Sequence, residues 1–237
     1  MKIAIIGYGK MGKEIEKIAL ERNHEIIFRF DKNNVSEFTV ENLKKVDVAI
    51  EFTEPSQAYD NYGKCFDAEI PVVSGTTGWL DKLPNIKDAC KLNNKTFFYA
   101  SNFSLGVNLF FKLNKQLAKL INKTDNYNVE ISETHHTEKK DAPSGTAITL
   151  AEGIIENFDK KVSWVKEKST QKDEIAIKSF RIDKVPGTHT IKYDSEVDFI
   201  EITHSAKSRK GFALGAVVAA EFVKDKTGFF TMEDIIS

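Results

Sequence analysis

The sequence of 237 residues has only two cysteines, and none of its apolar runs approaches the length of a membrane-spanning helix. Cys65 and Cys90 show neither the spacing of metal ligands nor that of a disulfide framework. We therefore expect both to be reduced packing residues in a soluble, cytoplasmic protein. The apolar run after Lys2 ends at Gly7, and we expect it to be a first strand rather than a secretory signal.

An excess of charge of either sign is also missing. Lysine and arginine together number 34 and aspartate and glutamate 35, which gives a formal net charge of −1. This balance gives no indication of nucleic acid or an anionic membrane as a partner. The hydrophobic content of 41% and the charged content of 29% are ordinary for a globular protein, which at this length can bury a core in one large domain or two small ones.

Short apolar runs alternate with helical patterns up to about residue 103. The expected strands are Lys2–Ile6, Glu25–Asp31, Val46–Thr53, Ile70–Thr77 and Thr96–Asn102. The expected helices between them run from the first glycines to Asn23, and over Ser56–Phe66 and Trp79–Asn93. Continuous apolar strands separated by helices predict a parallel sheet with helices on both faces.

A glycine pattern, G-x-G-x-x-G, directly follows the first expected strand and opens the first helix. Gly7 permits a tight turn, Gly9 lets a pyrophosphate approach the backbone, and Gly12 lets helix and strand pack closely. The alternative is a tight turn without a ligand, but the strand and helix on either side favour a Rossmann-type dinucleotide site. The residues expected to contact the cofactor are Gly7, Tyr8, Gly9, Lys10, Met11 and Gly12.

Asp31 ends the second expected strand, about where a ribose-binding acid belongs in such a domain. Its carboxylate would pair with the 2′-hydroxyl of NADH and repel the 2′-phosphate of NADPH. Lys32 lies beside it and could partly offset that repulsion. We expect NADH or NADPH as cofactor, with NADH slightly favoured.

Two further segments follow the fourth and fifth expected strands, at the carboxyl edge where parallel sheets bind ligands. Their small residues and free backbone groups suit the nicotinamide side of the cofactor, although turns can need glycine and asparagine for backbone reasons alone. The residues expected to contact the cofactor there are Gly75, Thr76, Thr77, Ala100, Ser101, Asn102 and Phe103.

The stretch from Glu130 to Ala147 carries the most chemistry. It begins as an alternating strand, continues through a polar segment with His135 and His136, and ends on Pro143-Ser144, a helix-start signal. The two histidines thus lie beside the amino end of a helix, where free N–H groups can receive a carboxylate. Glu133, His135, His136 and Glu138 could in principle bind a metal, but adjacent strand residues point to opposite sides, so we expect none.

This stretch is similar, position for position, to the signature of the dihydrodipicolinate reductase (4-hydroxy-tetrahydrodipicolinate reductase) family, E-[IV]-x-E-x-H-x-x-x-K-x-D-x-P-S-G-T-A. The fixed positions are filled by Glu130, Ile131, Glu133, His135, Lys139, Asp141, Pro143, Ser144, Gly145, Thr146 and Ala147. A match of this length is far more specific than the glycine pattern alone. The segments Gly75–Thr77 and Ala100–Phe103 also resemble the family's cofactor loops, and Glu51–Pro55 resembles a third loop.

The resemblance implies an NAD(P)H-dependent oxidoreductase that reduces 4-hydroxy-tetrahydrodipicolinate to tetrahydrodipicolinate in lysine and diaminopimelate biosynthesis. His135 is implied as the proton donor and Lys139 as a second catalytic group, which neighbouring cations could bring toward a neutral pKa. His136, Gly145 and Thr146 are implied as contacts for the substrate's carboxylates. Asp141 is implied to cap the turn or to orient Lys139.

The second half of the chain predicts a different architecture. A helix over Leu105–Leu120, the signature strand and helix, and strands at Glu174–Asp183, Thr188–Ser195 and Asp198–Ala206 predict an α+β domain with an open mixed sheet. Asp159–Asp173 is expected to be a surface connection. The resemblance implies that a last helix, Arg209–Lys224, returns to the nucleotide domain, so that residues 1–104 and 208–237 form one domain and 105–207 the other.

The family resemblance also implies a homotetramer that packs through the sheets of the second domain. Two departures from the family pattern stand out. The glycine loop is one residue shorter, with Lys10 in place of an arginine, and Gly187-Thr188-His189-Thr190 replaces G-E-H-T. The alternatives left open are a dehydrogenase of another amino or imino acid, and a catalytically silent NAD(H) sensor, which the presence of His135 and Lys139 argues against.

Overall fold

The structure is a computed structural model and describes residues 1–124, 126–208 and 210–237. These residues form two compact units, one made of Met1–Asn108 and Lys210–Ser237, the other of Leu109–Arg209. Arg209, at which a helix is predicted to begin, lies outside the described residues. None of the helices in the described part of the chain combines the length and apolarity needed to span a bilayer.

A six-stranded parallel sheet forms the centre of the first unit, in the order β11-β5-β4-β3-β1-β2. Its strands are β1 (Lys2–Ile6), β2 (Glu25–Phe30), β3 (Val48–Glu51), β4 (Val72–Ser74), β5 (Thr96–Tyr99) and β11 (Gly228–Phe230). The sequence predicts the first five of these, most of them longer than observed. It does not predict β11, a short strand that joins the edge of the sheet beside β5.

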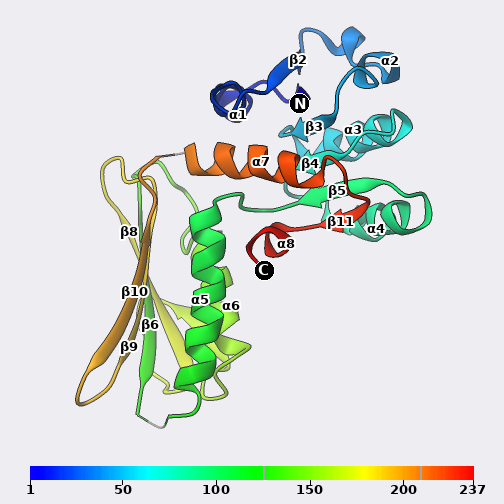
Figure 1. Cartoon of the computed structure of the whole chain (residues 1–237). Coiled ribbons are helices and arrows are strands. Elements are labelled where there is room, and N and C mark those ends of the chain that lie inside the picture. Colours follow the sequence, from blue (N-terminus) through cyan, green and yellow to red (C-terminus); the bar gives the residue numbers. More distant parts are fainter. Residues whose placement is uncertain (125, 209) are drawn as a thin grey trace. The chain divides into compact units, whose positions relative to one another are not determined.

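Helices cover both faces of this sheet (Figure 1). On one face, α1 (Lys10–Glu21) and α7 (Lys210–Val223) share a core with the strands; on the other, α3 (Pro55–Asp67) and α4 (Leu83–Leu92) do so. Cys65 and Cys90 are free and buried in the second of these cores, as the sequence predicts. The short helices not predicted from the sequence are η1 (Val35–Glu37), α2 (Val40–Leu43), η2 (Leu80–Lys82) and α8 (Met232–Ile236).

The second unit is built on a five-stranded mixed sheet in the order β10-β9-β6-β8-β7. Its strands are β6 (Asn128–His135), β7 (Ser163–Lys166), β8 (Glu174–Arg181), β9 (Thr188–Asp194) and β10 (Phe199–Ser205). β6, β8 and β7 are parallel neighbours, and β9 runs antiparallel to both β6 and β10. The predicted connection over Asp159–Asp173 is wrong in part, because it contains β7.

One face of this sheet carries the core of the second unit. α5 (Leu105–Ile121) and α6 (Gly145–Ile155) lie on that face (Figure 1). Alternate residues of three strands point toward them, among them Ile131, Ile177 and Ile191, all fully buried. Because the side-chain period of a strand is two, the next inward positions toward the end of β6 are Glu133 and His135. Strand alternation therefore directs two ionisable residues toward the helix-covered side.

Candidate functional site

The first unit contains a cleft of about 790 Å³ at the carboxyl ends of β1, β2 and β3. The glycine loop, the end of β2, the segment after β3 and one side of α3 form its walls. Of the residues predicted to contact a cofactor, the cleft brings together Gly7, Tyr8, Gly9 and Asp31, with Lys32 beside them. Gly75–Thr77 and Ala100–Phe103 follow β4 and β5 on the same edge of the sheet but lie outside this cleft.

The turn after β1 has the geometry that a bound pyrophosphate requires. Gly7 has a φ of +94°, and a β-carbon there would collide with the carbonyl oxygen of Phe52. Gly9 precedes α1 without a side-chain cap, and a β-carbon at this position would meet no atom within 4 Å. The first N–H groups of α1 therefore remain available to an anion in front of Gly9. The loop fits a dinucleotide phosphate.

Tyr8 and Asp31 are each held by a hydrogen bond within the first unit. The Tyr8 hydroxyl donates a hydrogen bond to Glu16, which also pairs with Arg29 of β2. Arg29 is engaged with Glu16, and Lys32 lies beside Asp31 at the cleft. One Asp31 carboxylate oxygen accepts the Asn33 N–H at 2.7 Å, which fixes the acid at the end of β2. Lys10 is exposed, and Met11 packs against the core.

The predicted contacts after β4 and β5 differ in exposure. Thr76 is buried, and its hydroxyl donates to Glu51 at 3.0 Å, so that this group is occupied within the protein. Phe103 is 2% exposed and belongs to the core. The Asn102 side chain accepts the N–H of Ser104 at 2.9 Å, just before α5. Thr77 and Ser101 are exposed at the edge of the sheet, which leaves them accessible to a ligand.

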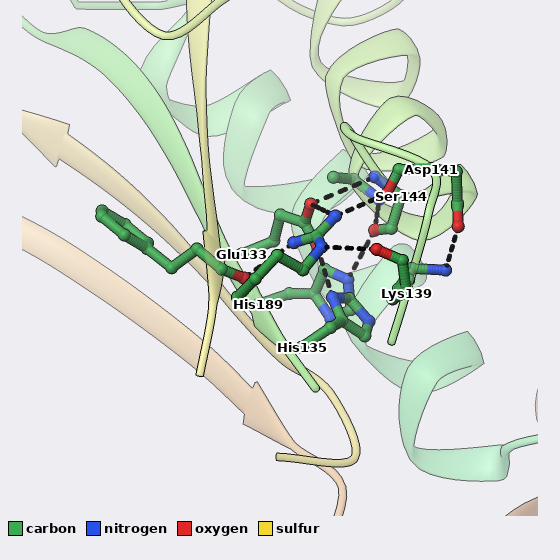
Figure 2. Close-up of polar contacts among 9 residues, drawn as sticks. Glu133, His135, Lys139, Asp141, Ser144 and His189 are labelled. Atoms are coloured by element: carbon green, nitrogen blue, oxygen red, sulfur yellow. Dashed lines mark hydrogen bonds and ion pairs between the residues drawn. The ribbon is translucent and has the colours of Figure 1, made fainter. Parts of the chain in front are cut away.

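A cluster of ionisable residues in the second unit lies at the end of β6 (Figure 2). Glu133 and His135 are the last inward-facing residues of β6, and each is largely buried. Arg181 comes from the end of β8, paired in register with His135, and His189 from β9, paired with Glu133. Three neighbouring strands thus bring an acid, two imidazoles and a guanidinium together above the apolar core.

Glu133 is the centre of this group. One oxygen accepts hydrogen bonds from the Arg181 guanidinium at 3.0 Å and from the Ser144 N–H at 3.2 Å, and the other pairs with Nδ1 of His135. Burial would raise the pKa of Glu133, but hydrogen bonds from His135, Ser179 and Arg181 outweigh it and lower the pKa to about 2. Glu133 is therefore a carboxylate at neutral pH.

The Glu133 carboxylate determines which nitrogen of His135 can exchange a proton. A carboxylate only accepts hydrogen bonds, so Nδ1 of His135 must carry the proton that lies between them. Nε2 is then the nitrogen that can gain or lose a proton. It lies against Gly187, in the turn before β9, where an added β-carbon would be 3.0 Å away.

We expect the substitution Gly187→Ala to lower kcat by roughly ten- to a hundredfold, the scale of a small misplacement of a reacting group. Gly187 has a φ of +152°, which is strained for alanine, and the added methyl group would press on Nε2 of His135. Steady-state kinetics and thermal unfolding measure the effect. Gly63→Ala is the matched control, because a β-carbon at position 63 meets no atom within 4 Å. Unchanged kcat in Gly187→Ala would contradict the role given to Nε2.

His189 is a buried, neutral imidazole. Burial, and next the positive charge of His135, lower the pKa of His189 to about 4. Its ring lies edge-on to that of His135, with centroids 5.0 Å apart, and its Nε2 is 3.0 Å from the Ser144 hydroxyl. This packing links the His135 ring to the start of α6.

The amino end of α6 lies beside the histidines. Ser144 is its N-cap and accepts the Ala147 N–H at 3.2 Å. Gly145 and Thr146 begin the helix; the first is exposed and the second half-buried. At the first turn of a helix such N–H groups have no partner within the helix and are available to a carboxylate.

Lys139 lies between β6 and α6, and its ammonium group pairs with Asp141 at 2.8 Å. The hydrogen bond from Lys139 is the main cause that lowers the pKa of Asp141. Arg181 also holds this segment, since its Nε donates to the carbonyl oxygen of Lys139 at 3.3 Å. Asp141 is thus placed to orient Lys139 rather than to touch a substrate.

His136 directly follows β6 and is the neighbour of His135 in the chain. It lines a cavity of about 410 Å³ together with Lys184 and Pro186 from the segment before β9. Glu138 and Asp183 lie on the same wall, so that the cavity is mixed in charge.

A metal ion could in principle be held by ligand atoms of Glu133, His135 and His189, which all lie within 4.8 Å of one another. This set differs from the one considered from the sequence, because His189 takes the place of His136 and Glu138. The donor chemistry fits a cation poorly. Both Glu133 oxygens are taken by Arg181, Ser144 and His135, and the Arg181 guanidinium already neutralises the carboxylate. No step below uses a metal.

The sequence does not point to a role for Arg181, and it points to Glu51 and His189 only as parts of segments compared with the family pattern. Arg181 and His189 come from later strands and contact signature residues 48 and 45 positions earlier in the chain, and Glu51 lies under the cofactor loops. The sequence indicates Glu133 as a fixed position of the signature and as a possible metal ligand, but not as the partner of His135. Its alternation with Val129 and Ile131 is the signal that could have placed it inside, paired with His135.

Two family models together match nearly the whole chain. The family model described as "Dihydrodipicolinate reductase, N-terminus" matches residues 1–103, and the one described as "Dihydrodipicolinate reductase, C-terminus" matches residues 106–236. A 4-hydroxy-tetrahydrodipicolinate reductase from Christiangramia forsetii is 52% identical over 237 residues, covering 100% of this chain and 98% of the relative. One from Thermosipho africanus is 35% identical over 239 residues, covering 100% and 98%.

A solved structure of a dihydrodipicolinate reductase with bound dipicolinate, from a Paenisporosarcina species, is also similar. It superimposes with a TM-score of 0.84 at 26% sequence identity, over 99% of each chain. The similarity therefore extends over both units.

Proposed function

The chain belongs to the dihydrodipicolinate reductase family of NAD(P)H-dependent oxidoreductases, and from this premise we propose that it reduces 4-hydroxy-tetrahydrodipicolinate to tetrahydrodipicolinate. The observation that carries the proposal is the Glu133–His135 pair, which leaves Nε2 of a buried histidine as the proton-exchanging atom beside a helix amino end. The reaction belongs to lysine and diaminopimelate biosynthesis. The free thiols of Cys65 and Cys90 suit the cytoplasm as the compartment.

His135 acts as the proton donor of the proposed reaction. The cofactor, when bound, would supply a hydride to the conjugated imine that forms once the substrate's hydroxyl group has left as water, and the electron density left on the ring must be quenched by a proton. His135 delivers that proton from Nε2, while Glu133 holds Nδ1 and stabilises the charged imidazole. Lys139, fixed by Asp141, places a positive charge on the electron-rich side of the substrate.

The substrate's carboxylates require donors of hydrogen bonds. The N–H groups of Gly145 and Thr146 at the start of α6 supply one set, supported by the partial positive charge of the helix end. His136 supplies a further donor from the turn after β6. Ser144, held by His189 and capping the helix, keeps this turn in place.

NADH or NADPH oxidation, followed by nicotinamide absorbance, tests the proposal. The precursor is generated in the assay from pyruvate and aspartate semialdehyde, and rapid oxidation is the expected result. No oxidation despite intact NADH binding would overturn the assignment. Oxidation of another amino acid instead would identify a dehydrogenase with a different substrate, and binding without any turnover would identify a sensor.

Asp31 is proposed to favour NADH, and we expect Asp31→Ser to raise the NADPH:NADH ratio of kcat/KM by about tenfold. The carboxylate lines the cleft and would repel a 2′-phosphate, whereas a serine hydroxyl would not. Initial rates with each cofactor give the ratio. Lys32→Ala is the matched control and should lower the ratio, since it removes the cation next to the phosphate. If neither substitution changes this ratio of kcat/KM values, neither residue determines the cofactor preference.

A homotetramer through the sheet of the second unit is also proposed. Two large apolar residues, Phe180 and Phe199, lie on the face opposite α5 and α6, and they are 47% and 60% exposed. Threonines and serines occupy much of the remaining surface of β9 and β10 on that face, where Thr190 and Thr203 bond at 2.9 Å. A mass of about four chains in light scattering supports the tetramer, and a monomer in solution rejects it.

A further inference from the structure

Glu51, the last residue of β3, is a fully buried carboxylate whose oxygens are all bonded within the first unit. One oxygen accepts the Thr53 N–H at 3.1 Å, the Thr53 hydroxyl, and the Thr76 hydroxyl at 3.0 Å. The other accepts the Ser74 hydroxyl at 2.8 Å and the Tyr62 hydroxyl at 3.3 Å. Each of these partners is a neutral donor.

Burying an acid costs free energy unless its hydrogen bonds compensate, so a fully buried acid paired only with hydroxyl and N–H groups requires an explanation. A carboxylate is acceptor-only and matches a shell made entirely of donors. Tyr62 comes from α3, and the other partners lie after β3 and at or just after the end of β4. The acid therefore joins two neighbouring strand ends. Its side chain is thus the shared acceptor of two loops.

Both loops border the sites at which a dinucleotide is expected. Phe52, Thr53 and Glu54 line the cleft of the first unit, and the Phe52 carbonyl oxygen abuts Gly7, where the phosphate turn begins. On the other side, the Phe52 ring fills the space in which Gly75 would have a side chain. The Thr53 N–H also donates to the Thr76 hydroxyl at 2.8 Å, which closes the connection between the loops.

We propose that Glu51 is a positioning residue for the cofactor, which sets the affinity for the dinucleotide by holding the loop after β3 and the loop after β4 in one arrangement. The inference rests on the dinucleotide site of the proposed function. Glu51 lies beneath the loops and acts through Thr53, Ser74 and Thr76, without touching the cofactor. The Phe52 carbonyl lies against Gly7, so a shift of this carbonyl would displace the glycine turn that is expected to hold the phosphate.

The test measures the Kd for NADH by nicotinamide fluorescence in the full-length protein, together with kcat and thermal unfolding. Glu51→Gln is expected to raise the Kd about tenfold, the scale of losing a charge-assisted hydrogen bond, because the amide nitrogen cannot accept. kcat at saturating NADH should change less than the Kd. Ser74→Ala is expected to raise the Kd as well, and adding it to Glu51→Gln should add little if both act through one group.

Tyr62→Phe is the matched control, since it removes the hydrogen bonds of the α3 hydroxyl to Glu51 and to Ser74 but leaves every bond between Glu51 and the two loops in place. It should lower the unfolding temperature yet leave the Kd within about twofold of the wild type. If Glu51→Gln does not fold, the Kd of Ser74→Ala for NADH tests the inference by itself. An unchanged Kd in the folded variants, with NADH binding by the wild type, overturns the inference, whereas a wild type that does not bind NADH overturns the proposed function itself.

Discussion

Replacing His135 with glutamine is expected to lower kcat by roughly two to four powers of ten, the usual contribution of a general acid. Glutamine can retain a hydrogen bond to Glu133, but it has no proton to give at the position of Nε2. The Kd for NADH should remain unchanged, because the glycine loop and Asp31 belong to the other unit. Single-turnover kinetics and fluorescence titration separate the two effects.

The matched control for His135→Gln is His204→Gln. His204 is a half-buried histidine of β10 in the same sheet, paired in register with His189, and its ring packs near Phe110 without a hydrogen bond to Glu133 or His135 in the described residues. This control should keep kcat within about threefold, because nothing places its ring at a proton-transfer position. Near-wild-type turnover in His135→Gln would remove His135 as the acid and leave Lys139 as the remaining donor.

Features that depend on residues close together in the chain could be predicted from the sequence. The glycine turn after β1, the acid at the end of β2 and the alternation of β6 are each set by short-range steric and periodic rules. The cap of α6 at Ser144 follows in the same way from the proline and serine before it. These rules place His135 and the start of α6 beside each other before any tertiary contact is known.

Features that depend on pairing between distant segments could not be predicted. Glu133 meets Arg181, and Glu51 meets Ser74 and Thr76, only because the strands that carry them become neighbours in a sheet. β7 was missed because it is an edge strand, half-buried along its length, and so lacks clear alternation of apolar and polar residues. The short β11 is completed by pairing with β5 rather than by a pattern of its own.

We expect Glu133→Ala to lower the free energy of unfolding by about 3–5 kcal/mol at pH 7, which is the cost of breaking a buried ion pair on one side. The substitution leaves the Arg181 guanidinium, 19% exposed, without its carboxylate, and the Ser144 N–H without an acceptor. Urea unfolding measures the loss. Glu130→Ala is the matched control: it also pairs with a cation, Lys178, but it faces outward on the same strand, so its loss should cost at most about 1 kcal/mol.

The difference in the free energy of unfolding between the wild type and Glu133→Ala should depend on pH. Measuring it tests the same carboxylate independently of activity. The pKa of Glu133 is lowered from an ordinary 4.5 to about 2, so its charged form stabilises the folded state above pH 4.5. This contribution is lost as the pH falls from about 4.5 toward 2, where the carboxylate takes up a proton in the folded chain too. The stability gap between wild type and Glu133→Ala should therefore be constant near neutrality and shrink below pH 4.5. A gap that stays constant down to pH 3 would mean that Glu133 stabilises the fold by packing rather than by its charge, and the assignment of the proton on Nδ1 of His135 would lose its basis.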